Sequence, residues 1–148
     1  MPLRLTTPII KDFVLVDTDI KYGVGDESTK VVIKQASQMD NERRSNVLSK
    51  TTRLFDNETG LTKFKLTSEW SMAELMRMEV RLTLVGCNIE DENGKPLFKF
   101  KTEEGVPVMD MTDREFERAW GKLPGDIAQE IYEKVLEVNF DWRNPLAE

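Results

Sequence analysis

The most regular pattern of apolar positions runs from Ser68 to Cys87 and predicts a helix that is buried on most sides. Apolar residues recur there at spacings of three and four, which is the period of an α-helix. They form two neighbouring seams, one of Leu75, Met78, Leu82 and Val85 and the other of Met72, Met76, Val80 and Leu84. Because the remaining polar stripe is narrow, we expect other elements to surround this central helix.

Glu79 interrupts the apolar arc of the central helix and is therefore a candidate buried charge. A buried carboxylate needs a cation or hydrogen bonds, or it takes up a proton. The favoured interpretation is an ion pair with an arginine from another element, Arg43 or Arg44. A catalytic acid is the less favoured alternative, since the chain has no obvious partner group for such chemistry.

The N-terminal part predicts a β-hairpin within residues 1–36. Phe13 to Val16 and Lys30 to Gln35 are rich in strand-forming residues, and we expect these two runs to pair in antiparallel fashion. The polar residues 17–28 between them contain Gly23 and Gly25 and are expected to form a loop.

A second helix and a third strand are predicted before the central helix. Ser37 and Asp40 have the spacing of a capping box, and the helix that they begin is expected to run from Gln38 to about Phe55. Residues 56–60 are polar and predict a loop. The run from Leu61 to Leu66 alternates apolar residues with lysines, which is typical of a half-exposed strand.

The C-terminal half carries clear turn and capping signals. Asn93-Gly94 favours a tight turn, with paired strands at about 87–89 and 97–101 and a polar connector up to Asp110. Thr112 with Glu115 predicts a capped helix start. Pro124 suits the first turn of the last helix, in which Glu130 and Lys134 have the spacing of a favourable ion pair.

Together these elements predict an α+β fold in a single small domain spanning residues 1–148. The β-hairpin region occupies 1–36. The helical core occupies 37–142, with about four helices around the central buried helix and a second β-hairpin near residues 87–101. The last residues, 143–148, are expected to form a frayed tail.

Composition and charge narrow the class of protein. The 39% hydrophobic content is ordinary for a globular chain, and no apolar run approaches the roughly 20 residues that span a bilayer. No signal peptide is recognisable, so we expect a cytoplasmic protein without a membrane partner. The net charge of −6, without a concentrated basic stripe, argues against nucleic-acid binding.

The chain has no histidine and a single cysteine, Cys87. Histidine is the commonest general base and metal ligand, so zinc sites and Ser–His or Cys–His nucleophile pairs are effectively excluded. We therefore expect no cofactor, no metal and no enzymatic activity. Cys87 lies in an apolar setting and is interpreted as a core residue.

Several residues are candidates for binding a partner protein. Aromatic side chains dominate both cores and interface hot spots, and they gather in the C-terminal part: Phe116, Trp120, Tyr132, Phe140 and Trp142. The core interpretation is favoured, although Phe140 and Trp142 lie beyond the helix end and fit either a lid or an exposed anchor. Arg43 and Arg44 end a dense charged run, residues 40–44, that suits a contact patch or an ordinary solvated face.

Two further features fit partner binding. Methionine is common on adaptable binding surfaces but also fills cores, and this applies to Met72, Met76, Met78, Met109 and Met111. The core role is favoured for the three in the central helix, Met72, Met76 and Met78. The exposed strand edge of each predicted hairpin can accept a partner strand.

Several motifs follow one another over about residues 35 to 142: Leu-Val-Gly-Cys-Asn at 84–88, Gly-Lys-Pro-Leu-Phe at 94–98, Phe116 to Pro124, and a last helix that reaches Asn139. In this succession the chain resembles the tail assembly chaperones of long-tailed, siphovirus-type bacteriophages. The resemblance implies a non-enzymatic protein that binds the phage tape-measure protein, keeps it soluble and promotes assembly of the tail-tube protein. It also implies self-association as a homo-oligomer, a place in the host cytoplasm, and absence from the mature virion.

Two other classes remain open. One is an acidic inhibitor that mimics nucleic acid on a host nuclease, with Asp17, Asp19, Asp26 and Glu27 in place of phosphates. The other is a structural tail or adaptor protein, which would remain in the finished particle.

Overall fold

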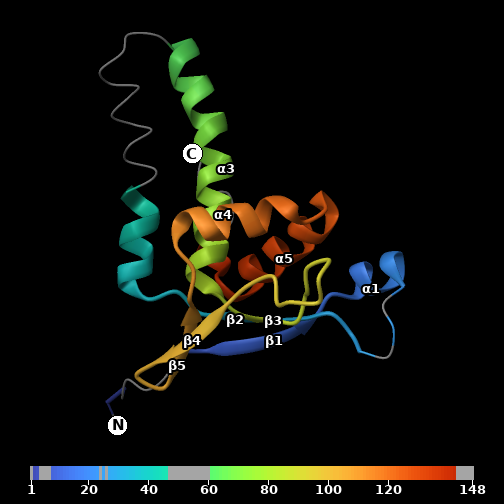
Figure 1. Cartoon of the computed structure of the whole chain (residues 1–148). Coiled ribbons are helices and arrows are strands. Elements are labelled where there is room, and N and C mark those ends of the chain that lie inside the picture. The colour runs from blue at the N-terminus through green and yellow to red at the C-terminus, as the bar shows by residue number, and fades with distance from the viewer. Residues whose placement is uncertain (1, 4–7, 24, 26, 47–60, 143–148) are drawn as a thin grey trace.

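The structure is a computed structural model that describes residues 2–3, 8–23, 25, 27–46 and 61–142, with the backbone alone over 61–71. It confirms the predicted α+β class (Figure 1). The elements in chain order are β1 (Ile10–Val14), α1 (Val16–Tyr22), β2 (Lys30–Lys34), a helical segment at 38–46, α3 (Leu61–Thr83), β3 (Leu84–Cys87), β4 (Phe100–Glu103), β5 (Val106–Met109), α4 (Asp113–Lys122), α5 (Gly125–Val138) and the 3-10 turn η1 (Phe140–Trp142). The predictions for 47–60 and for the tail at 143–148 lie outside the described residues.

The predicted pairing of the first two strands is confirmed. β1 and β2 are antiparallel, in a register that sets Ile10 opposite Lys34 and Val14 opposite Lys30. β3 pairs antiparallel with the other edge of β2, giving the strand order β1-β2-β3. Val31 and Ile33 of β2 are fully buried, so one face of this sheet supports the core.

The central helix, predicted at residues 68–87, has different ends in the structure. α3 ends at Thr83, because the next four residues form β3 and pair with β2 instead of continuing the helix. Gly86 permits this pairing, since a Cβ at that position would come within 2.8 Å of Cγ2 of Val32. The strand predicted from Leu61 to Leu66 is also wrong, because those residues are the start of α3. A six-residue alternation is a short signal, and it runs directly into a longer helical pattern.

The second hairpin lies further along the chain than predicted. β4 and β5 pair around a turn at Glu104 and Gly105, which both have positive φ, as a type I′ hairpin turn requires. The connector predicted after residue 101 is therefore a strand pair. The turn at Asn93-Gly94 does form, but it closes only a single bridge between Glu90 and Pro96, since proline cannot donate to a ladder.

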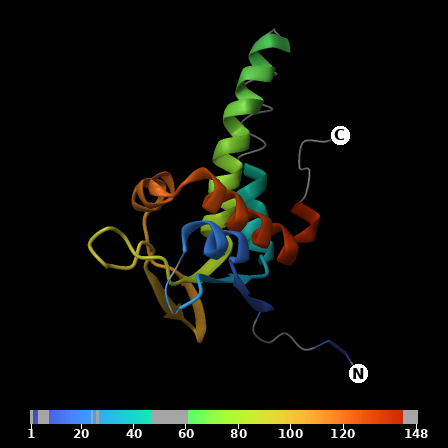
Figure 2. The ribbon, with the colours of Figure 1, turned by 90° about the vertical axis from the view of Figure 1, so that its right-hand side faces the viewer.

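Helices α3, α4 and α5 pack above the three-stranded sheet, and α3 extends well beyond the others (Figures 1 and 2). The capping boxes predicted at Ser37 and at Thr112 are confirmed. The Ser37 hydroxyl accepts from the Asp40 amide while Asp40 accepts from Ser37, and Thr112 and Glu115 exchange the same pair of bonds at the start of α4. The buried core joins the sheet to the helices through Leu15, Val31, Ile33, Val80, Leu84, Phe98, Phe116, Ile131, Val135 and Trp142.

Candidate functional site

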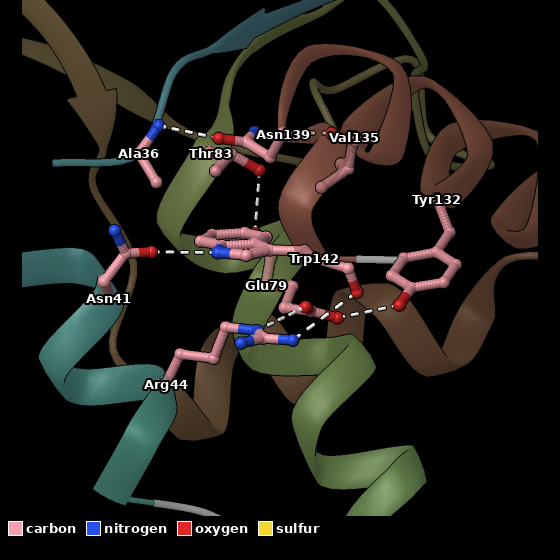
Figure 3. A network of polar contacts seen from close by, with 9 residues as sticks. All are labelled: Ala36, Asn41, Arg44, Glu79, Thr83, Tyr132, Val135, Asn139 and Trp142. Carbon is pink, nitrogen blue, oxygen red and sulfur yellow. Dashed lines mark hydrogen bonds and ion pairs between the residues drawn. The ribbon is translucent and has the colours of Figure 1, made fainter. Parts of the chain in front are cut away.

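Glu79 is fully buried on α3 and both of its carboxylate oxygens are occupied (Figure 3). One oxygen accepts from Nε of Arg44 at 2.7 Å, and the other accepts from the Tyr132 hydroxyl, also at 2.7 Å. Arg44 comes from the helical segment at 38–46 and Tyr132 from α5. The predicted buried ion pair is confirmed with Arg44. Arg43 is exposed and contacts the sulfur of Met39 instead.

Arg44 links this carboxylate to the C-terminal turn. Its guanidinium lies 5.3 Å from the centre of the Trp142 ring and donates to the Trp142 carbonyl at 3.4 Å. The indole nitrogen of Trp142 donates in turn to Asn41, at 2.8 Å. Nearby, the Asn139 side chain accepts from the Ala36 amide at 2.8 Å. The turn η1, which follows α5, and the 38–46 segment are therefore joined through partly buried polar contacts (Figure 3).

The electrostatics of Glu79 suit a structural clamp. Burial raises its pKa, and the hydrogen bonds from Arg44 and Tyr132 oppose that rise by stabilising the anion. The pKa of Tyr132 is raised because burial and the neighbouring Glu79 disfavour a phenolate. A general acid must reach its substrate, whereas the fully buried Glu79 uses both oxygens within the chain.

Residues 16–22 form α1, although the sequence predicts the end of a strand at Val16 and a loop from residue 17. The N-cap residue Leu15 provides no side-chain cap. Glu130, from the middle of α5, caps the helix instead. Its carboxylate accepts from the amides of Asp17 and Thr18, at 3.1 and 3.0 Å, and from the Thr18 hydroxyl at 2.7 Å. The predicted Glu130–Lys134 pair is wrong, because Glu130 faces α1 and Lys134 pairs with Glu137.

The other end of α1 is fixed to the start of α5. Asp126 accepts from the Lys21 ammonium at 2.6 Å and from the Tyr22 hydroxyl at 2.9 Å. The hydrogen bonds from Lys21 and Tyr22 lower the pKa of Asp126. α1 and α5 lie side by side in both ribbon views (Figures 1 and 2). Polar contacts therefore hold α1 to the body of the protein at both of its ends.

The outward face of α1 is apolar. Val16 and Ile20 are one helical turn apart and are 55% and 77% exposed. A surface helix normally turns its apolar face toward the core, whereas α1 binds the body through Thr18 and its polar neighbours. Neighbouring apolar side chains that stay exposed on one helix face are candidates for an interaction surface. We name Val16 and Ile20 the α1 apolar pair.

The aromatic residues predicted to bind a partner differ in how far they are buried. Phe116 and Trp142 are buried, and Trp120 is half-buried and stacks on Phe116 with ring centres 6.0 Å apart. Tyr132 is held by Glu79. Phe140 is 72% exposed. The favoured core interpretation is confirmed for Phe116 and Trp142. A partner-binding role stays a prediction for the five aromatic residues and for Arg43 and Arg44.

The acidic residues proposed as phosphate mimics are not equivalent. Asp17 and Glu27 are exposed. Asp19 accepts from the Thr29 amide at 3.0 Å and so orders the segment before β2. Asp26 lies outside the described residues. Of the five methionines considered for partner binding, Met72 is exposed, and Met76, Met78, Met109 and Met111 are half-buried.

Within the described part of the chain, no helix is both long and apolar enough to cross a membrane, and no group of acidic or cysteine side chains is arranged to hold a metal ion. The fold and the contacts above define a small α+β protein with an apolar surface on α1. Comparison with known protein families, curated proteins and solved structures finds no match to this chain.

Proposed function

We propose that this chain is a non-enzymatic tail assembly chaperone of a long-tailed bacteriophage, which binds the tape-measure protein in the host cytoplasm and is absent from the mature virion. The observation that carries the proposal is the α1 apolar pair, which is held outward by the contacts of Glu130 and Asp126. The resemblance over residues 35 to 142 gives independent support.

The chemistry of the α1 apolar pair suits such a partner. A tape-measure protein is a long helical chain with apolar stripes, and it aggregates when those stripes are unprotected. An apolar side chain from one stripe can pack against Val16 and Ile20, as in other helix-mediated recognition. The net charge of −6 helps to keep the complex soluble while the tail-tube protein assembles.

The test is a gentle pull-down of the tagged chain from cells in which the phage is assembling tails, with the bound proteins identified by mass spectrometry. Recovery of the tape-measure protein, together with absence of the chain from purified particles, is the expected result. Recovery of a host nuclease would favour the acidic inhibitor. Presence of the chain in finished particles would favour a structural tail or adaptor protein.

A further inference from the structure

β1 is the open edge of the three-stranded sheet (Figure 1). It pairs with β2 on one side, and no described strand pairs with its other side. At the opposite end of the strand order, β3 lies against β5. An open edge can accept a further strand through its main-chain groups.

The register shows which residues of β1 direct their backbone groups away from β2. Ile9 accepts from the Gln35 amide at 2.7 Å, and the Leu15 amide donates to the Thr29 carbonyl at 2.9 Å, so residues 9 and 15 face β2. The register between them is continuous, and successive residues of a strand direct their backbone groups to alternate sides. The even-numbered residues of β1 therefore direct their N–H and C=O groups to the open side.

These even-numbered residues are Ile10, Asp12 and Val14. No described group outside the sheet hydrogen-bonds to their backbones. Their side chains lie on the outer face of the sheet, because the side chain of Phe13 alternates with theirs and packs against the core. Ile10 and Val14 are 37% and 41% exposed, which offers apolar surface to a neighbouring strand.

Lys11 and Asp12 determine which strand fits this edge. Both residues are exposed, and neither forms an ion pair within the described ranges of the chain. Their side chains lie on opposite faces of β1, since they are adjacent in the strand. A neighbouring strand can therefore set a separate opposite charge beside each of them, and such cross-strand pairs are favourable.

A second copy of β1 does not supply these charges. Directly opposite residues of an antiparallel pair have the same hydrogen-bonding type, whereas Lys11 and Asp12 direct their backbone groups to different sides. Lys11 of one copy therefore cannot lie opposite Asp12 of another. The symmetric register about Asp12 sets two carboxylates opposite each other, and the one about Lys11 sets two ammonium groups opposite each other, which is unfavourable. The charges favour a strand of different sequence.

We propose that the open edge of β1 binds an antiparallel strand of a partner protein, with a basic residue opposite Asp12 and an acidic residue opposite Lys11. Apolar residues of that strand lie opposite Ile10 and Val14. Main-chain hydrogen bonds provide affinity, and the two charge pairs provide selectivity. This site is independent of the proposed chaperone function, which depends on the α1 apolar pair.

The test is an NMR titration of the isotope-labelled chain with a blocked peptide, Thr-Val-Thr-Lys-Glu-Ile-Thr, designed to lie antiparallel to β1. The control peptide, Thr-Val-Thr-Glu-Lys-Ile-Thr, has the same composition with the two charges exchanged. Saturable shifts of the Ile10, Asp12 and Val14 amides are expected, with binding of the first peptide about fivefold tighter or more. Equal binding of the two peptides, binding of neither, or shifts confined to other elements would overturn the proposal.

A variant with exchanged charges tests the pairing itself. Lys11→Glu combined with Asp12→Lys leaves the net charge unchanged and should reverse the preference, so that the control peptide binds more tightly. Both positions are exposed, so the variant should fold like the parent, and unchanged amide spectra outside β1 check this. A preference that stays with the first peptide would overturn the role of the two charges.

Hydrogen exchange of the chain alone tests whether the edge is open. The Ile10, Asp12 and Val14 amides should exchange rapidly, whereas those of Lys11 and Phe13, which face β2, should be protected. Equal protection of all five amides would show that another segment of the chain or a second copy covers the edge, and it would overturn the proposal.

Discussion

Glu79 is the fully buried side chain that joins Arg44 to Tyr132. Replacing it by glutamine keeps its shape but leaves Arg44 without a counter-charge and sets an amide donor against another donor, either Arg44 or Tyr132. We expect Glu79→Gln to lower the free energy of unfolding by about 3 kcal/mol, as when one partner of a buried ion pair is removed. Urea unfolding measures this change.

The control for that measurement is Glu133→Gln, at an exposed position of α5. It should change the free energy of unfolding by no more than about 0.5 kcal/mol. Equal stability of the two variants would contradict a stabilising role for the Glu79 contacts.

Cys87 provides a pH-dependent prediction at the same scale. Burial raises the pKa of its thiol to about 11, against a reference value of 9.0. Since the thiolate is the reactive form, Cys87 should react with a thiol reagent at about pH 8 roughly 100-fold more slowly than an unperturbed cysteine. The rate should rise as the pH approaches 11 and should become normal in denaturant. A normal rate in the folded protein would show that the thiol is accessible and unperturbed.

At the scale of elements, α1 depends on a cap from a distant part of the chain. Glu130→Ala removes all of the hydrogen bonds that Glu130 accepts at the start of α1. We expect a loss of about 1–2 kcal/mol, the usual cost of deleting an N-terminal cap. Hydrogen exchange should show faster exchange of the Asp17 and Thr18 amides. The exposed Gln129→Ala is the control, and unchanged exchange at α1 in Glu130→Ala would refute the capping role.

The close approach of β2 and β3 makes a second prediction for the elements. Gly86→Ala places a Cβ 2.8 Å from Cγ2 of Val32 and should destabilise the protein by about 1–3 kcal/mol, the typical cost of overpacking. Gly121→Ala in α4 is the matched control, because a Cβ there meets nothing within 4 Å and alanine favours a helix by about 0.5–1 kcal/mol. Thermal unfolding should therefore separate the two variants in opposite directions. A Gly86→Ala protein as stable as the parent would mean that the strands can separate without cost.

Local signals account for the parts of the fold that the sequence predicted well. The capping boxes at Ser37 and Thr112 involve neighbours three residues apart, so they can be recognised without a structure. α1 could not be recognised, because its cap lies on Glu130, 112 residues beyond Thr18. Likewise, residues 84–87 continue the helical period locally, and only pairing with β2 makes them a strand.

In the candidate site, too, local patterns could be predicted from the sequence, whereas contacts between distant parts of the chain could not. Glu79 could be predicted as a buried charge that needs an arginine partner, because it lies within the apolar arc of the central helix. The structure shows that the partner is Arg44. The α1 apolar pair had no comparable signal, since Val16 and Ile20 become neighbours on one face only when residues 16–22 are helical. Recognising the pair also requires knowing which face of α1 is held against α5, and this depends on Glu130 and Asp126.

At the scale of the whole molecule, we propose that the outward face of α1 protects a tape-measure protein. The most direct measurement is the soluble fraction of the tape-measure protein when it is co-expressed with the chain. We expect the parent chain to keep it soluble and Val16→Ser combined with Ile20→Ser to lose most of this effect, because the exposed apolar contact is removed.

The matched control for this measurement combines Leu3→Ser with Ile9→Ser, which removes apolar residues that are also exposed but lie outside α1. All three proteins should fold equally well, since surface substitutions of this kind usually change stability by no more than about 0.5 kcal/mol. Solubilisation by the parent and the control, with loss in the α1 double variant, is the result that the proposed function predicts. A tape-measure protein that is equally insoluble with the parent chain and without it would contradict the proposed function.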